Sequence, residues 1–99
     1  MLNTIKKRSN DRLTIALVGR VDASNASDLE QEVKSSLDGV TELVFDLEKL
    51  VYISSAGLRV LLMAQKKMDK QGSMKVLHVN DMVMEVFVNM GFKDILTIE

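Results

Sequence analysis

The fold is decided by residues 42–61, which read ELVFDLEKLVYISSAGLRVL. The first six residues form the apolar run of a buried strand, and a shorter apolar step follows at 51–53. Two serines and two small residues come next, and after them leucines recur at helical spacing. A strand followed by a helix is the building unit of α/β proteins, in which crossover helices join parallel strands.

The same alternation of strands and helices extends to both sides of this stretch. Strands are expected at 2–7, 12–21, 42–47, 75–79 and 95–98, and helices at 24–37, 55–71 and 81–90. The resulting order is β-β-α-β-α-β-α-β, with a polar turn at 9–11 between the first two strands. We therefore expect one α/β domain over residues 1–99, with three helices and a mixed, mostly parallel sheet that has an N-terminal antiparallel strand.

The composition argues against several classes of protein. Lys and Arg number 13 and Asp and Glu 14, so the chain lacks the basic excess of most nucleic-acid binders. It has no cysteine, which removes disulfides and thiolate metal sites. The longest strongly apolar run, at 60–64, is far shorter than the roughly 20 residues that span a bilayer, and no secretory signal is visible. A cytoplasmic protein without a membrane span is expected.

No catalytic constellation is visible in the sequence. The only histidine, His78, falls within a predicted strand, where a packed or surface residue is more common than a general base. The motifs G-x-S-x-G, G-x-G-x-x-G and the phosphate-binding Walker loop are missing, and no His, Asp and Glu set has metal-ligand spacing. We expect neither enzymatic activity nor a metal or cofactor.

The segment around Ser54 and Ser55 is the most informative one. Ser55 is predicted to be the N-cap of the helix, and a simple cap would account for its hydroxyl. Gly57 lowers helix propensity in the first turn, which favours a role in which another group approaches the backbone closely. A phosphoryl group on Ser55 would lie at the positive end of the helix dipole. Both readings of Ser55 stay open on local grounds.

Three motifs in this order resemble a known family. They are GRVD at 19–22, VFDL at 44–47 and ISSAGLRVL at 53–61, and the last is the most specific. The chain resembles, over nearly its whole length, a single STAS domain of the anti-sigma factor antagonist type. The resemblance implies a STAS-like fold in which Ser55 is the phosphorylated residue. It also implies that Asp22 and Asp46 lie near that serine, beside Ser54 and Gly57.

The sequence departs from the family pattern at two points. Ser54 stands where the family often has aspartate, and the C-terminal helix that is common in the family does not follow the last predicted strand. The mechanism that the resemblance implies is partner switching. The unmodified protein binds an anti-sigma factor that is also a serine kinase, and the sigma factor is released. Phosphorylation ends the binding, and a serine phosphatase restores it. A monomer or weak dimer is expected.

The helix after Ser55 carries a candidate docking face. Arg59, Met63, Lys66 and Lys70 follow one another at steps of four, three and four residues, with Val60 beside them. A solvated face with basic residues near the helix C-terminus is the alternative reading. We expect partner contacts from Ser55, Arg59, Val60, Met63 and Lys66.

Two other functions compete with this one. The first is a different STAS role, as a subunit of a lipid-transport complex or of a signalling scaffold. The second is a small enzyme or nucleotide binder on an α/β fold, which would need the phosphate loop or catalytic pair that the sequence lacks. Phosphorylation of Ser55 by a partner kinase separates the antagonist role from both.

Overall fold

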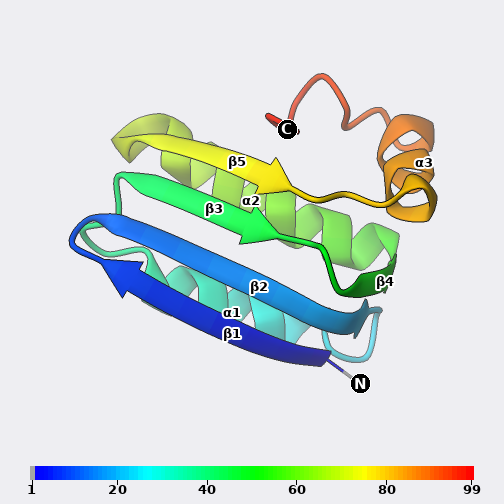
Figure 1. The fold of residues 1–99 in the computed structure, drawn as a ribbon, viewed down its shortest axis with the longest axis horizontal. Coiled ribbons are helices and arrows are strands. Elements are labelled where there is room, and N and C mark those ends of the chain that lie inside the picture. Colours follow the sequence, from blue (N-terminus) through cyan, green and yellow to red (C-terminus); the bar gives the residue numbers. More distant parts are fainter. Residues whose placement is uncertain (1) are drawn as a thin grey trace.

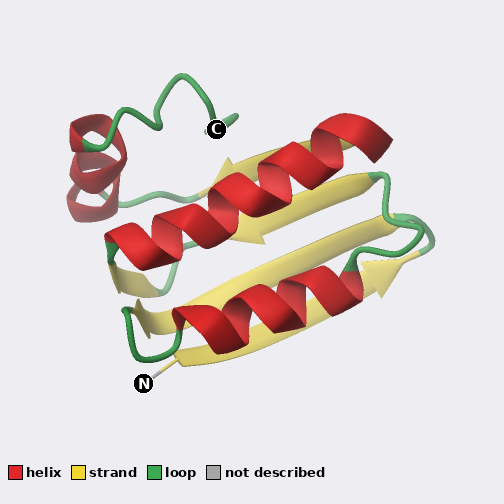
Figure 2. Ribbon diagram, turned by 180° about the vertical axis from the view of Figure 1, so that it is seen from behind, coloured by secondary structure: helices red, strands yellow, loops and turns green. Residues whose placement is uncertain are grey.

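Two helices lie side by side across one face of a five-stranded sheet in this computed structural model, which describes residues 2–99 (Figure 1, Figure 2). The strands are β1 (Leu2–Ser9), β2 (Arg12–Val21), β3 (Glu42–Asp46), β4 (Leu50–Ile53) and β5 (Ser73–Leu77). The helices are α1 (Ala26–Ser36), α2 (Ser55–Gln71) and α3 (Asp81–Asn89). Helices α1 and α2 cover the sheet, and α3 lies at one end of the domain, near β4 (Figure 1).

The sheet is mixed and mostly parallel. Its order is β1-β2-β3-β5, with β4 pairing the last residues of β2 beyond the end of β3. Strands β1 and β2 form an antiparallel hairpin in which Ser9 is opposite Arg12. Strand β2 pairs in parallel with β3 and with β4, and β3 pairs in parallel with β5. The predicted fold class, with an N-terminal antiparallel strand and three helices, is confirmed.

Two elements differ from the predicted order. The apolar step at 51–53 belongs to strand β4, so that the observed order is β-β-α-β-β-α-β-α. The strand predicted at 95–98 is wrong, since this segment makes only one parallel bridge, between Ile98 and Val76. The reason lies in the backbone: the N–H groups of Ile95 and Leu96 both donate to the carbonyl of Phe92, and a turn consumes the donors that a strand would need.

Alternation along β2 shows how the sheet separates its two faces. Leu13, Ile15 and Leu17 are buried in the main core, under the helices. The intervening Thr14 and Ala16 lie on the opposite face, which no helix covers (Figure 1). Covering one face only leaves the helices with a shared outer surface and the sheet with an open one.

Helix α3 buries only a small part of its surface. Val83 and Phe87 are buried, but Met82 is 64% exposed and Met90 is also exposed. Because α3 packs against the end of the sheet rather than across it, only a narrow stripe meets the core.

Candidate functional site

The start of α2 lies where β2 and β4 end, and its backbone is tied to β2. The Ser54 N–H donates to the carbonyl of Val21 at 2.9 Å. The Ser54 hydroxyl accepts a hydrogen bond from the Gly57 N–H at 3.3 Å, so Ser54 is the N-cap of α2. The prediction that Ser55 is the cap is therefore wrong by one residue. Ser54 has the extended backbone that a cap needs, while Ser55 is the first helical residue and is exposed.

Gly57 is small for a reason internal to the fold. A Cβ atom at this position would lie 2.7 Å from the Cγ1 atoms of both Val21 and Ile53. Gly57 is itself buried. The groups that approach its backbone closely are thus side chains at the ends of β2 and β4. The close approach holds the first turn of α2 against both strands.

Asp22 follows Val21 directly and belongs to the same end of the domain. Its carboxylate accepts hydrogen bonds from the Ser24 hydroxyl and N–H, and these bonds lower the pKa of Asp22 below its usual value. Arg20 lies 3.3 Å from the same carboxylate. Asp22 is thereby held as a fixed negative charge at the N-terminal end of α1.

Asp46 lies on the open face of the sheet. Its Oδ1 atom is 2.9 Å from Nδ1 of His78 and accepts a hydrogen bond from the Glu48 N–H. Burial pushes the pKa of Asp46 upward, but the bonds from His78 and Glu48 outweigh it and leave the pKa below its usual value. Among residues 2–99, no hydrogen bond joins Asp46 to Ser54 or Ser55. Asp22 follows Val21, whose carbonyl accepts the Ser54 N–H, but its own side chain and N–H form hydrogen bonds with Ser24 and Asn25.

The sequence predicts that His78 lies within a strand, and this prediction is wrong. His78 follows the end of β5 with a positive φ of 59° and is exposed, and its ring reaches across to the end of β3. The bond to Asp46 raises the pKa of His78 above its usual value. The only histidine in the chain is thus hydrogen-bonded to Asp46.

Asp46, Glu48 and His78 form a group that the sequence spacing did not reveal. One ligand-type atom from each lies within 4.8 Å of the others, because β3 and β5 are neighbours in the sheet. The expectation concerned spacing along the sequence, and only the pairing of β3 with β5 brings these three residues together. The hydrogen bond between His78 and Asp46 accounts for the grouping, and we assign no ion to it.

The predicted docking residues on α2 divide into two kinds. Arg59 and Lys66 are exposed, and Met63 is half-buried beside them. Val60 is only 2% exposed and belongs to the main core, so its predicted role in partner contact is wrong. Because α2 lies flat on the sheet, its buried stripe is wide enough to include position 60.

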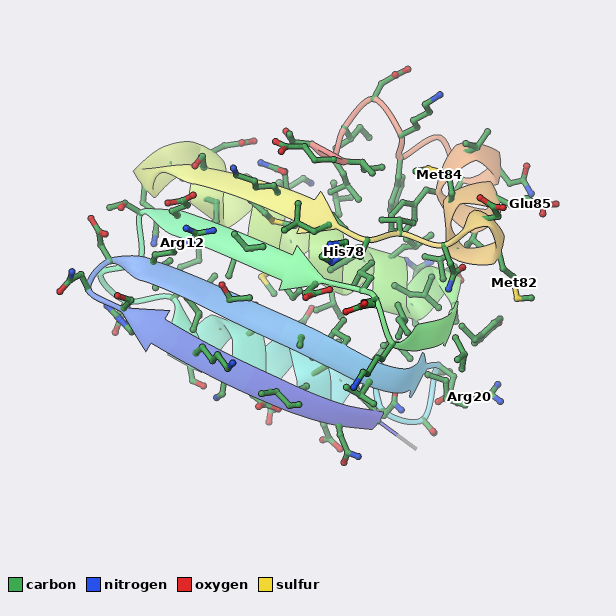
Figure 3. The ribbon with its side chains drawn as sticks, viewed as in Figure 1. Arg12, Arg20, His78, Met82, Met84 and Glu85 are labelled. Atoms are coloured by element: carbon green, nitrogen blue, oxygen red, sulfur yellow. The ribbon has the colours of Figure 1, made fainter. Side chains whose placement is uncertain are left out.

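Three exposed apolar side chains of β4 and α3 were missed from the sequence. Val51 and Tyr52 of β4 are 61% and 40% exposed, and Met82 of α3 is 64% exposed. We refer to these three residues as the apolar rim. A hydrogen bond from the Asn80 side chain to the Leu50 carbonyl ties α3 to β4, and Figure 3 shows Met82 and Arg20 at this same end. The guanidinium of Arg20 lies 5.0 Å from the centre of the Tyr52 ring.

This arrangement suits a hydroxyl that another protein modifies. A serine nucleophile needs a general base within about 2.6–3.2 Å. Within the described part of the chain, no hydrogen bond joins Ser55 to a histidine or a carboxylate. Ser55 instead lies open to solvent at a helix N-terminus, with apolar side chains nearby.

Sequence comparison agrees with this geometry. Residues 3–99 match the STAS domain. The chain belongs to the STAS domain family. This STAS domain is 40% identical over 88 residues to BtrV of Bordetella bronchiseptica, a protein named as an anti-sigma factor antagonist. The match covers 87% of this chain and 76% of that protein.

Two solved structures have the same fold. An anti-sigma factor antagonist from Mycobacterium paratuberculosis matches with a TM-score of 0.89 at 20% identity, over 99% of this STAS domain and 85% of that chain. The Bacillus cell fate determinant SpoIIAA in its phosphorylated form matches with a TM-score of 0.76 at 16% identity, over 98% and 91% of the two chains. No helix within residues 2–99 of this STAS domain is long and apolar enough to cross a membrane.

Proposed function

We propose that this protein is an anti-sigma factor antagonist that acts by partner switching, and that Ser55 is the residue whose phosphorylation ends binding. The observation that carries the proposal is the position of Ser55. It is the exposed first residue of α2, at the end of the domain that also presents Asp22 and the apolar rim. The name of the Bordetella relative supports the antagonist role, and SpoIIAA supports it as a protein of this fold that exists in a phosphorylated form.

In the unmodified state, the end of the domain around Ser55 binds an anti-sigma factor that is also a serine kinase. Exposed apolar side chains that cluster on a surface are typical of protein interfaces, and aromatic residues and methionine are enriched there. Tyr52 and Met82 supply such contacts, and Arg59 lies one turn after Ser55 on α2. Occupation of the kinase by this surface releases the sigma factor.

Phosphorylation reverses the binding without disturbing the fold. The positive end of the helix dipole accommodates an anion on Ser55. The same phosphate adds roughly 1.5 to 2 negative charges to a surface that loses its water on docking. The carboxylate of Asp22, whose lowered pKa keeps it ionised, adds a further negative charge at this end of the domain.

The protein itself is a ligand and a substrate in this cycle and not an enzyme. The partner kinase transfers the phosphoryl group from ATP to the Ser55 hydroxyl, with ADP as the leaving product. A separate serine phosphatase hydrolyses the phosphoserine to serine and inorganic phosphate. All three proteins act in the cytoplasm, and the antagonist acts as a monomer or weak dimer.

A reconstituted competition experiment tests the proposal. A complex of candidate kinase and labelled sigma factor is mixed with the unmodified protein, and release of the sigma factor is followed by fluorescence anisotropy. We expect release before ATP is added and recapture of the sigma factor after ATP is added, but no recapture with Ser55→Ala. An unmodified protein that neither binds the kinases encoded beside its gene nor releases a sigma factor would refute the antagonist role.

A further inference from the structure

A groove with basic walls lies between α1 and α2, toward the ends of both helices. Figure 2 shows the two helices side by side over the sheet. The groove has a volume of about 520 Å³ and is lined by Lys34 of α1 and, from α2, by Met63, Lys66, Lys67, Lys70 and Gln71. We call this set the lysine groove. It opens on the outer surface of the helical layer and is distinct from the end that carries Ser55.

The walls of the lysine groove are held in place by hydrogen bonds. The Gln71 side-chain amide donates to the carbonyls of Leu37 and Val40, at 2.8 and 2.6 Å. These bonds tie the end of α2 to the segment that follows α1. Met63 packs against the main core with part of its side chain and leaves the rest to the groove. The groove is therefore a built feature and not a gap between loosely packed helices.

Positive charge is concentrated on this helix. Residues 55–71 contain four basic side chains and one acidic one, a net charge of +3, in a chain whose net charge is −1. Among the described residues, Lys66, Lys67 and Lys70 take part in no ion pair, while Lys34 lies 3.7 Å from Glu30. The helix dipoles favour Lys70 and Lys34, which lie in the last turns of α2 and α1. They do not account for Lys66 and Lys67, or for Met63 within the groove.

We infer that the lysine groove binds an acidic amphipathic segment of the partner protein, with carboxylates against the lysines and an apolar side chain against Met63. The inference rests on the proposed function for the identity of the partner. Charge complementarity selects the acidic segment, and the groove between two helices suits a peptide helix that presents apolar residues on one side. A lipid surface fits less well, because Met63 is recessed between the helices and does not project from them.

The lysine groove is remote from Ser55. Lys66 and Lys70 follow Ser55 by 11 and 15 residues, which is about 16 and 22 Å along a helix that rises 1.5 Å per residue. Charges on a protein surface are screened over about 8 Å at physiological ionic strength. A phosphate on Ser55 therefore leaves this contact unchanged. The groove contributes the same contact in both states, so the loss of affinity on phosphorylation arises at the other end of α2.

A peptide assay tests the inference on the full chain. The probe is a fluorescein-labelled helical peptide with glutamates along one side and leucines along the other, and the matched control peptide has glutamine at every glutamate. We expect the glutamate peptide to bind and the glutamine peptide to bind at least about tenfold more weakly. Binding of the glutamate peptide should also fall as salt is raised from 0.05 to about 0.3 M.

Charge-reversal variants locate the binding. Lys66→Glu with Lys70→Glu should weaken binding of the glutamate peptide about tenfold or more. Lys49→Glu with Lys93→Glu makes the same change in net charge elsewhere and should alter affinity less than about twofold, as should Ser55→Asp. Equal loss in both double variants, equal binding of the two peptides, or displacement of the peptide by phosphatidylglycerol vesicles would overturn the inference. The assay contains no kinase, sigma factor or ATP. A negative result would therefore refute the groove inference and not the Ser55 switch, which the competition experiment tests separately.

Discussion

The two ends of helix α2 differ in what they present to a partner. The N-terminal end is made of small uncharged residues at 54–57 and exposes one hydroxyl, beside an apolar rim. The C-terminal end presents lysines around a groove and carries permanent charge. The difference teaches that one rigid helix can hold a modifiable contact and a constant contact far enough apart to act separately.

The largest effect is expected at the N-terminal end. An unpaired charge at an interface costs about 2–5 kcal/mol, which corresponds to a loss of affinity of roughly 30- to 5000-fold. Ser55→Asp should therefore bind the partner kinase within that range of weakening, as measured by isothermal titration calorimetry. Lys66→Glu with Lys70→Glu should weaken the same complex about tenfold, and the two losses should add in free energy because the sites are distant.

The fold supplies the control for this comparison. An acidic side chain in the first turn of a helix is favourable by about 0.3–1 kcal/mol, so Ser55→Asp should melt no lower than the parent protein. If Ser55→Asp binds like Ser55→Ala while both remain folded, charge at this end does not control docking.

Changes in the apolar rim should weaken binding to the partner kinase strongly, but less than a charge at Ser55 does. Tyr52→Ala and Met82→Asp each remove an exposed contact next to Ser55, and interface anchors commonly cost about 2 kcal/mol or more when lost. We expect a weakening of about 30-fold for each, with little change in thermal stability. Val88→Asp, on the same helix as Met82 and similarly exposed, is the matched control. Equal affinity of Met82→Asp and Val88→Asp would remove α3 from the interface.

Gly57 should reveal how the N-terminal end is positioned. A methyl group in Gly57→Ala meets Val21 and Ile53 at 2.7 Å, and overpacking of this kind costs about 1–3 kcal/mol. Chemical denaturation should show that loss of stability. Gly91→Ala is not a fair control because of its positive φ, whereas Ala56→Gly tests the same turn without added volume. A Gly57→Ala protein as stable as the parent would contradict the observed packing of α2 on β2 and β4.

The smallest effect is expected at His78, away from both ends of α2. Its pKa is raised by the hydrogen bond to Asp46, so in Asp46→Asn the pKa should fall toward the ordinary value of 6.5, as followed by NMR titration of the ring protons. The raised pKa means that this contact stabilises the fold fully below 6.5 and less as the pH rises through the folded-state value. The lowered pKa of Asp46 means that the same contact is lost as the pH falls below about 3.8. An unchanged His78 pKa in Asp46→Asn would show that the bond to Asp46 does not raise the pKa of His78.

The sequence could predict the sheet and the three helices because their apolar periodicity is strong. It could not predict β4 as a separate strand, because β4 is four residues long and pairs only with the end of β2. Ser54 and Ser55 are equally good caps by residue type, and only the backbone geometry of the strand-to-helix turn distinguishes them. The local pattern therefore placed both serines at the start of the helix but did not distinguish the role of each.

Other parts of the site depend on contacts between distant segments. Val60 looked free because helical spacing does not say how wide the buried stripe is, and packing across the sheet made it wide. The hydrogen bond between His78 and Asp46 joins the ends of β3 and β5. The last paired residues of these strands, Asp46 and Leu77, are 31 residues apart in the sequence. The apolar rim joins β4 to α3 and is visible only once these elements are in place.

The most direct test of the central claim is to map the phosphate. The protein and its Ser54→Ala and Ser55→Ala variants are incubated with the partner kinase and ATP, and each product is analysed by peptide mass spectrometry. We predict one phosphate on Ser55 in the parent and in Ser54→Ala, and none in Ser55→Ala, since the Ser54 hydroxyl is engaged as the helix cap while Ser55 is exposed. A phosphate on Ser54, or a phosphorylated Ser55→Ala protein, would contradict the account.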